Sequence, residues 1–154
     1  MDEAVGLRKN KIYLDNCCYN RPYDDQIQPK VIIETLAKLH IQELVLNQKL
    51  DLVWSYILAY ENSQNISEAK REAISQWEKL SVEFIGKSDS LVALAQKIEK
   101  TGIKPFDALH ISCAITAQCD YLVTTDKRML KYKNDRIVIC NPIDFINMEG
   151  EYDK

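Results

Sequence analysis

The sequence predicts an α/β fold, a three-layer α/β/α domain built around a mainly parallel sheet of about five strands. Three observations predict it. Short apolar segments alternate with longer segments of helical periodicity. Glycine and proline are scarce, at four each, which argues against an all-β fold with many tight turns. The length of 154 residues suits one ordinary domain, so we expect a single domain over residues 1–154 with its core at about 11–146.

Five segments have the brief apolar, β-branched or aromatic composition of strands that are covered on both faces. Each is bounded by a segment of another pattern, and none is long enough to be read as a helix. The expected strands are 11–15, 51–55, 82–85, 121–124 and 136–140.

The segments between these strands carry helical patterns with recognisable ends. Two of them open on a proline in the first turn, and a third begins at a capping serine and stops at Gly102. Another has Asn65 and Glu68 at the spacing of a capping box. The expected helices are 29–48, 65–80, 88–101, 105–118 and a short basic helix after Asp126.

Charge and cysteine usage limit the class of protein. The net charge is −3 and the pI about 5.4, whereas nucleic-acid binders usually have a basic balance, so the distribution of charge matters more than its sum. No apolar run approaches the ~20 residues of a membrane span, and the first ten residues do not resemble a secretory signal, so we expect a soluble, cytoplasmic protein. The cysteines are odd in number and lack a Cys-x-x-Cys pair, which predicts free thiols: Cys17, Cys18, Cys113, Cys119 and Cys140.

Four acidic residues are expected at one edge of the sheet. Asp15 ends the first strand, Glu61 follows the second by about a turn and a half, Asp107 lies in the first turn of a helix, and Asp126 comes two residues after the fourth strand. In βαβ units the carboxyl ends of strands and the amino ends of helices share one edge, where ligands of open α/β sheets bind. Asp120, by contrast, precedes a strand and belongs at the opposite edge.

Converging carboxylates repel one another. Two unit charges ~4 Å apart repel by about 4 kcal/mol at an effective dielectric constant of 20. A protein with a net stability of roughly 5–15 kcal/mol therefore needs a cation or raised pKa values to hold four of them together. Hard oxygen ligands select Mg²⁺ or Mn²⁺, ions that engage substrate phosphates. The expected chemistry is phosphodiester hydrolysis.

Structural roles can also explain these acids. Asp107 in the first turn of a helix is favoured by the helix dipole, and Asp126 could cap the helix after it. Other acids fall near the same edge, so geometry alone does not select the four: Asp24, Asp25, Asp89 and Asp144.

A resemblance to a known family selects four of these acids. The stretch Phe106–Ala117, followed by Tyr121–Asp126, resembles the signature of PIN domains, in which an Asp-Ala pair opens an apolar helix and the next strand ends in Thr-x-Asp. Lys11–Asn16 resembles the first strand of that family with its leading aspartate, and Asn141–Phe145 resembles its Asn-Pro-x-x-Phe segment. The resemblance runs over residues 11–146. Residues 20–26 also resemble a bacterial PIN subgroup with Arg-Pro-x-Asp-Asp after the first strand.

The resemblance implies a metal-dependent endoribonuclease, often the toxin of a type II toxin–antitoxin pair of the VapC type, commonly dimeric and inhibited by an antitoxin protein. It implies that Asp15, Glu61, Asp107 and Asp126 hold Mg²⁺ or Mn²⁺, with Glu34 as a competitor for the place of Glu61. Some family members carry a further acid after Thr-x-Asp, whereas basic residues follow here. A second metal ion would then be held less tightly, or recruited only with RNA.

Other residues are candidates for supporting and RNA-binding roles. Thr124 and Asn16 could orient a ligand water, although a strand residue and a turn residue are the alternatives. His110 shares a helical face with Asp107, and we expect a core or supporting histidine rather than a metal ligand. A basic run beyond Asp126 is either a solvated face or an RNA contact. The candidates for RNA binding are Arg21, Lys127, Arg128 and Lys131.

Two other function classes stay open. The first is a catalytically silent PIN-fold module that binds RNA or acts as a scaffold. The second is a haloacid-dehalogenase-like phosphatase, which would need a second aspartate two residues after Asp15, where the sequence has Cys17.

Overall fold

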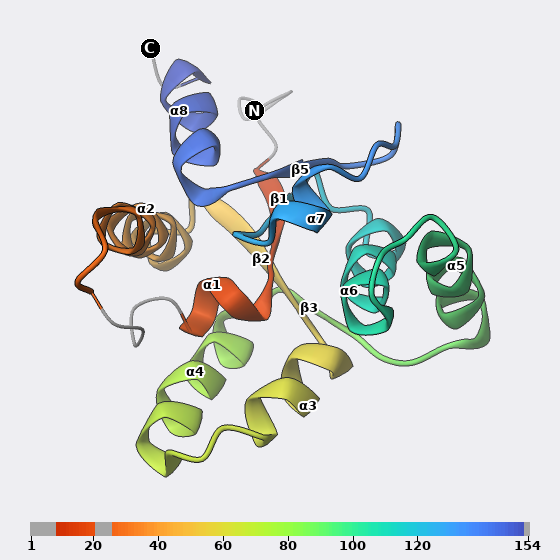
Figure 1. The fold of residues 1–154 in the computed structure, drawn as a ribbon. Helices are drawn as coiled ribbons and strands as arrows, with labels where there is room; N and C mark the ends of the chain where they lie inside the picture. The colour runs from red at the N-terminus through yellow and green to blue at the C-terminus, as the bar shows by residue number, and fades with distance from the viewer. Residues whose placement is uncertain (1–8, 21–25, 153–154) are drawn as a thin grey trace, which may run out of the picture.

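The core of the protein is a five-stranded sheet in which every neighbouring pair of strands is parallel, in the order β3-β2-β1-β4-β5 (Figure 1). The structure is a computed structural model that describes residues 9–20 and 26–152, without the side chains of residues 150–152. All five predicted strands are present, and the predicted fold class is confirmed. Their bounds are β1 (Asn10–Leu14), β2 (Leu50–Ser55), β3 (Glu83–Ile85), β4 (Tyr121–Val123) and β5 (Val138–Cys140).

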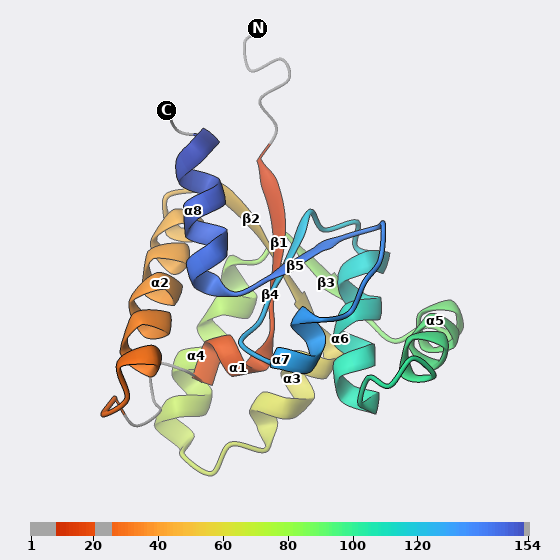
Figure 2. The ribbon, with the colours of Figure 1, turned by 45° about the horizontal axis from the view of Figure 1, so that its top comes forward.

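Helices cover both faces of this sheet and make the outer two layers. α2, α4 and α8 lie on one face, and α5 and α6 lie on the other (Figures 1 and 2). The helices within the described residues are α1 (Asn16–Asn20), α2 (Pro29–Leu46), α3 (Tyr56–Ser63), α4 (Glu68–Leu80), α5 (Asp89–Glu99), α6 (Pro105–Thr116), α7 (Lys127–Leu130) and α8 (Pro142–Tyr152). None of them combines the length and apolar composition that a membrane span requires.

Several element ends differ from the prediction for local reasons. The predicted capping box at Asn65 and Glu68 is wrong: Ser67 caps α4, its Oγ accepting the Lys70 N–H at 3.2 Å, while the Asn65 side chain donates to Asn62 Oδ1 at 2.7 Å. The last strand begins at Val138 rather than at residue 136 because Asn134 Oδ1 accepts both the Arg136 and Ile137 N–H groups at 2.8 Å.

The capping serine and the glycine that the sequence predicts at the two ends of α5 are found there. Ser88 caps its beginning by accepting the Leu91 N–H at 3.2 Å. The chain turns away after it at Gly102, whose φ of +106° is open to glycine and strained for other residues. This turn sends the chain into α6, the helix that carries Asp107.

The central strands are buried on both faces. Residues Ile12–Leu14 of β1 and Leu52–Val53 of β2 have no exposed surface, as expected for strands between two helical layers. The strands are in register at their carboxyl ends: Ser55 pairs with Ile85, and Leu14 with Val123. α1, α3 and α7 therefore begin along one edge of the sheet, the lower edge in Figure 2.

The remaining sequence predictions about packing agree with the structure. All five cysteines are free, and four are buried. Asp120 lies at the edge opposite to the acids, where its Oδ2 accepts the Lys11 N–H at 2.8 Å at the start of β1.

Candidate functional site

Three side chains from three different elements meet at the carboxyl edge of the sheet. Asp15 follows β1 directly, Glu61 lies on α3, and His110 lies on α6; each offers a ligand atom, and these atoms all lie within 4.8 Å of one another. His110 Nε2 is 2.6 Å from Glu61 Oε1 and 3.5 Å from Asp15 Oδ1. Asp15 and His110 are 5% and 1% exposed, so their charges are poorly screened.

Asp107 and Asp126 lie near enough to share the field of this group. Burial, and after it the charges of Asp15, Asp126 and Glu61, raise the pKa of Asp107 from 3.8 to about 6, against a smaller lowering by His110. A carboxyl group that stays partly protonated near neutral pH is the response expected of several acids held together. The structure thus brings Asp15 and Glu61 together, and the charges of Asp15, Asp126 and Glu61 act on Asp107.

Glu34, the sequence-based competitor of Glu61, lies elsewhere. It is buried at 3% exposure on α2, and it is absent from the group of converging ligand atoms. Glu61 reaches the group because Ser55 is both the last residue of β2 and the cap of α3, its Oγ accepting the Leu58 N–H at 3.1 Å. The helix therefore starts without a loop, and its second turn stands over the end of the sheet.

Thr124 and Asn16 hold the Asp15 carboxylate. Thr124 Oγ1 donates to Asp15 Oδ2 at 2.8 Å and accepts the Asp126 N–H at 3.0 Å, so one hydroxyl connects two of the acids. The Asn16 N–H donates to Asp15 Oδ1 at 2.7 Å. That Thr124 orients a ligand water stays a prediction, since in the structure its hydroxyl proton is donated to Asp15. Asn16 begins helix α1 rather than a simple turn.

Cys17 is a contact of Asp15 that sequence reasoning missed. Its thiol donates to Asp15 Oδ2 at 3.3 Å, and its sulfur accepts the Thr125 N–H at 3.3 Å. The available signal was its position, since a residue two places after a strand-ending aspartate, in the first turn of a helix, can face back toward that aspartate. Cys17 thereby links the loop after β4 to the site.

Asp126 has the capping role that the sequence left open, and its charge also reaches Asp107. Its Oδ1 caps α7 by accepting the Arg128 and Met129 N–H groups at 2.8 and 3.2 Å, and its charge acts on Asp107. Capping fixes the carboxylate at the edge of the sheet.

The predicted RNA contacts at 127, 128 and 131 are exposed and lie in or just after α7. Arg128 and Lys131 also line a hollow of about 410 Å³, together with Lys133, Tyr132 and residues 101–103. Arg21 lies outside the described residues.

His110 is the centre of a buried hydrogen-bond chain. Its Nε2 donates to Glu61, and its Nδ1 is 2.6 Å from the Tyr13 hydroxyl, which lies 2.6 Å from Ser55 Oγ. Burial alone lowers the pKa of His110, but the charges of Asp15 and Glu61 outweigh it and raise the pKa above its usual value. An imidazolium here offsets part of the acidic charge and holds α3 and α6 in place.

The donor set fits a hard divalent cation. Carboxylate oxygens from Asp15, Glu61, Asp107 and Asp126 are the ligands that Mg²⁺ and Mn²⁺ prefer. His110 Nε2 already donates to Glu61, the arrangement of a histidine that orients a carboxylate. The supporting role of His110 stays a prediction.

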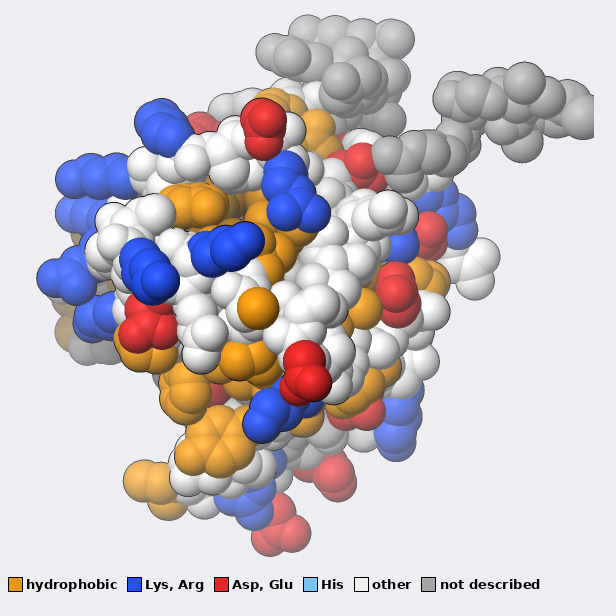
Figure 3. All heavy atoms as spheres, turned by 90° about the vertical axis from the view of Figure 1, so that its right-hand side faces the viewer, with side chains coloured by type: hydrophobic (Ala, Val, Ile, Leu, Met, Phe, Trp, Pro, Cys, Tyr) orange, Lys and Arg blue, Asp and Glu red, His pale blue; other side chains and the backbone are white. Residues whose placement is uncertain are grey.

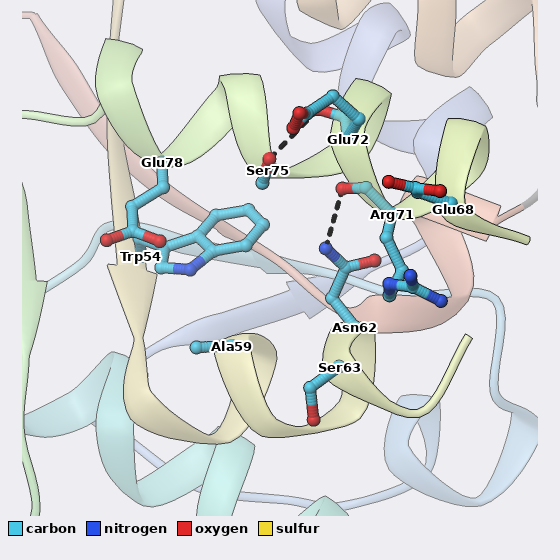
Figure 4. Close-up of a pocket in the computed structure, with 9 residues that line it drawn as sticks. All are labelled: Trp54, Ala59, Asn62, Ser63, Glu68, Arg71, Glu72, Ser75 and Glu78. Carbon is cyan, nitrogen blue, oxygen red and sulfur yellow. Dashed lines mark hydrogen bonds between the residues drawn. The ribbon is translucent and has the colours of Figure 1, made fainter. Parts of the chain in front are cut away.

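A separate hollow of about 380 Å³ lies between α3 and α4 and contains none of these acids (Figure 4). Asn62 Nδ2 reaches across to donate to the Arg71 carbonyl at 3.0 Å, and the Arg71 guanidinium donates to the Asn65 carbonyl. These bonds tie the end of α3 to α4 and so steady the helix that carries Glu61. The lining residues are Trp54, Ala59, Asn62, Ser63, Glu68, Arg71, Glu72, Ser75 and Glu78.

Known proteins resemble this chain over most of its length. A family model described as "PIN domain" matches residues 12–135. A chain in the crystal structure of VapBC2 from Rickettsia felis, bound to a DNA fragment from their promoter, has a similar fold: the TM-score is 0.53 at 17% sequence identity, covering 85% of this chain and 98% of that one. At this identity the likeness concerns the fold alone. No curated protein matches the sequence.

Proposed function

This chain belongs to the PIN-domain family, and from that premise we propose that it is a Mg²⁺- or Mn²⁺-dependent endoribonuclease that hydrolyses phosphodiester bonds in RNA. One observation carries the proposal. Asp15 and Glu61 meet at the carboxyl edge of a parallel sheet, and burial together with the charges of Asp15, Asp126 and Glu61 raises the pKa of Asp107 to about 6.

The four carboxylates of Asp15, Glu61, Asp107 and Asp126 would hold the cation. When bound, a divalent ion supplies positive charge against the scissile phosphate and lowers the pKa of water. Thr124 keeps the Asp15 carboxylate oriented, and His110 does the same for Glu61. Hydrolysis by water would leave a 5′-phosphate and a 3′-hydroxyl.

The basic residues after Asp126 would bind the RNA backbone. Lys127, Arg128 and Lys131 are exposed beside the acids, and we assign them, with Arg21, to phosphate contacts. Each contact releases a counterion, so binding should weaken steeply with salt. A net charge of −3 is compatible with this role because five of the twenty basic residues lie within the short stretch 127–136.

We further propose that the chain is a cytoplasmic toxin of a type II toxin–antitoxin pair and that it forms a homodimer. Support comes from the fold it shares with a chain of a VapBC2 assembly. Expression of the chain alone should arrest growth, and co-expression with the product of a neighbouring small reading frame should relieve the arrest and yield a complex on purification. Growth arrest that Asp15→Asn leaves intact would contradict the toxin assignment.

The experiment that tests the nuclease assignment is a cleavage assay on a structured RNA with Mg²⁺, with Mn²⁺ and with EDTA. Wild type should cleave with metal only, and the products should carry 5′-phosphates. Asp15→Asn and Asp107→Asn should each lower the rate by on the order of a hundredfold or more. RNA binding without cleavage in any metal would identify the alternative, a catalytically silent RNA-binding module.

A further inference from the structure

Two aromatic side chains are exposed in contact with each other beside the acids. Tyr60 of α3 and Phe106 of α6 are 49% and 46% exposed. Their ring centroids are 5.8 Å apart and their planes make an angle of 72°, an edge-to-face arrangement. About half of each residue's surface thus faces water, although an aromatic pair that served only to hold two helices together would gain more stability if buried.

The position of the pair is set by the acids. Tyr60 precedes Glu61 and Phe106 precedes Asp107. Successive residues on a helix point about 100° apart, so each ring stands beside its acid without occupying the same space. The two helices that bring Glu61 and Asp107 together therefore also bring their neighbouring rings together, at the border of the acidic site.

Basic side chains also lie near the acids, at α7 and before α6. The hollow lined by Arg128, Lys131 and Lys133 lies beside α7, the helix that Asp126 caps. Lys104, the exposed residue that precedes α6, adds a cation two residues before Phe106 in the chain. Figure 3 looks onto the side of the molecule that carries α5 and α6 and shows Lys and Arg side chains gathered in the upper half of that face, with exposed hydrophobic side chains below them.

We propose that Tyr60 and Phe106 form a stacking platform for an unpaired base of single-stranded RNA, next to the phosphate that the acids engage; the proposal rests on the nuclease function proposed above. An exposed aromatic surface offers a π face that any base can stack on, and cations beside it hold the connected phosphates. A base inside a duplex cannot present its face, so the platform selects unpaired RNA.

The test measures binding rather than cleavage, with EDTA present throughout. The probe is a fluorescein-labelled single-stranded RNA of twelve mixed-sequence nucleotides, and the readout is its dissociation constant by fluorescence anisotropy. Tyr60→Leu and Phe106→Leu keep apolar volume and remove the π face. Their combination should weaken binding by roughly fivefold to a hundredfold, the range for loss of one stacked base. The matched control is Phe84→Leu on β3, since Phe84 is 49% exposed and lies outside the acidic group.

Two further readouts separate stacking from charge and from damage to the fold. A series of RNAs is made in which each RNA lacks the base at one position. Wild type should bind more weakly to the RNA that lacks the stacked base, whereas the double variant should bind all of these RNAs as it binds the complete one. The slope of binding against salt should be equal for wild type and the double variant, because no phosphate contact is lost. Melting temperatures confirm that the variants are folded.

The outcomes distinguish this proposal from the nuclease assignment. A double variant that binds the RNA as tightly as wild type overturns the platform, even if metal-dependent cleavage is found. Base-dependent binding that the double variant loses supports the platform, even if no metal gives cleavage. Wild type that does not bind the RNA, or that binds a duplex of the same sequence more tightly, also overturns it.

Discussion

Replacement of Asp107 by asparagine should stabilise the metal-free protein. In the folded chain burial and the neighbouring acids raise the pKa of Asp107 from its ordinary 3.8 to about 6. That difference corresponds to about 3 kcal/mol of unfolding free energy. Asp107 is only half-buried, so solvent screening reduces the expected gain to about 1–2 kcal/mol.

The sign and the pH window follow from proton binding. Between pH 3.8 and about 6 the folded state binds more protons at Asp107 than the unfolded state, so the unfolding free energy falls as pH rises through this window. Asparagine removes the dependence. Its stabilising effect should therefore be close to zero below about pH 4, about half complete at pH 5 and full above about pH 7.

The assay is urea unfolding in EDTA at several pH values between 5 and 8, with wild type and Asp107→Asn in parallel. Asp89→Asn is the matched control, because Asp89 also lies in the first turn of a helix but is exposed and outside the acidic group. It should lower stability slightly through the helix dipole at every pH in this range. An Asp107→Asn variant that is no more stable than wild type at pH 8 would refute the view that the acids repel one another in the metal-free state.

Two further changes test the contacts of the site. Thr124→Val should lower the unfolding free energy by about 1–3 kcal/mol and weaken metal binding, because it removes the hydroxyl that donates to the buried Asp15 carboxylate and accepts the Asp126 N–H. Thr124→Ser keeps both bonds, and equal urea midpoints for the two variants would count against this role. His110→Leu should be most destabilising near pH 6. The folded pKa of His110 is raised, so its charge contributes its full stabilisation below the ordinary pKa of 6.5, and this stabilisation is lost as pH rises through the folded pKa. Urea unfolding of His110→Leu at pH 6 and pH 9 checks this, and a loss that grows with pH would contradict it.

The sequence predicted the sheet well because its strands are short apolar runs with no competing pattern. Helices α2, α5 and α6 were foreseen from prolines, a capping serine and a glycine, which are local signals. The short helix α1, and α3 with its strand-ending cap Ser55, were not foreseen. The switch from strand to helix there takes place within one residue, without a loop to mark it.

The positions of the acids could be predicted, but their partners could not. Strand ends and helix starts place Asp15, Asp107 and Asp126 at one edge by topology alone. The bridge from His110 to Glu61 joins residues 49 positions apart, and it depends on how α3 packs against α6. The contact between Cys17 and Thr124 at Asp15 joins residues 107 positions apart, and it depends likewise on the register of β1 and β4. Such contacts have no signature in a single sequence.

The central claim, that these carboxylates form one divalent-cation site, is tested most directly by titrating Mn²⁺ into the metal-free protein while following its melting temperature. The melting temperature of wild type should rise by several degrees and reach a plateau by millimolar Mn²⁺, because the ion binds the folded state and relieves repulsion among the acids. Asp15→Asn should lose most of that rise, and Asp89→Asn should keep it. No shift in wild type at millimolar Mn²⁺, or an equal shift in Asp15→Asn, would contradict the claim.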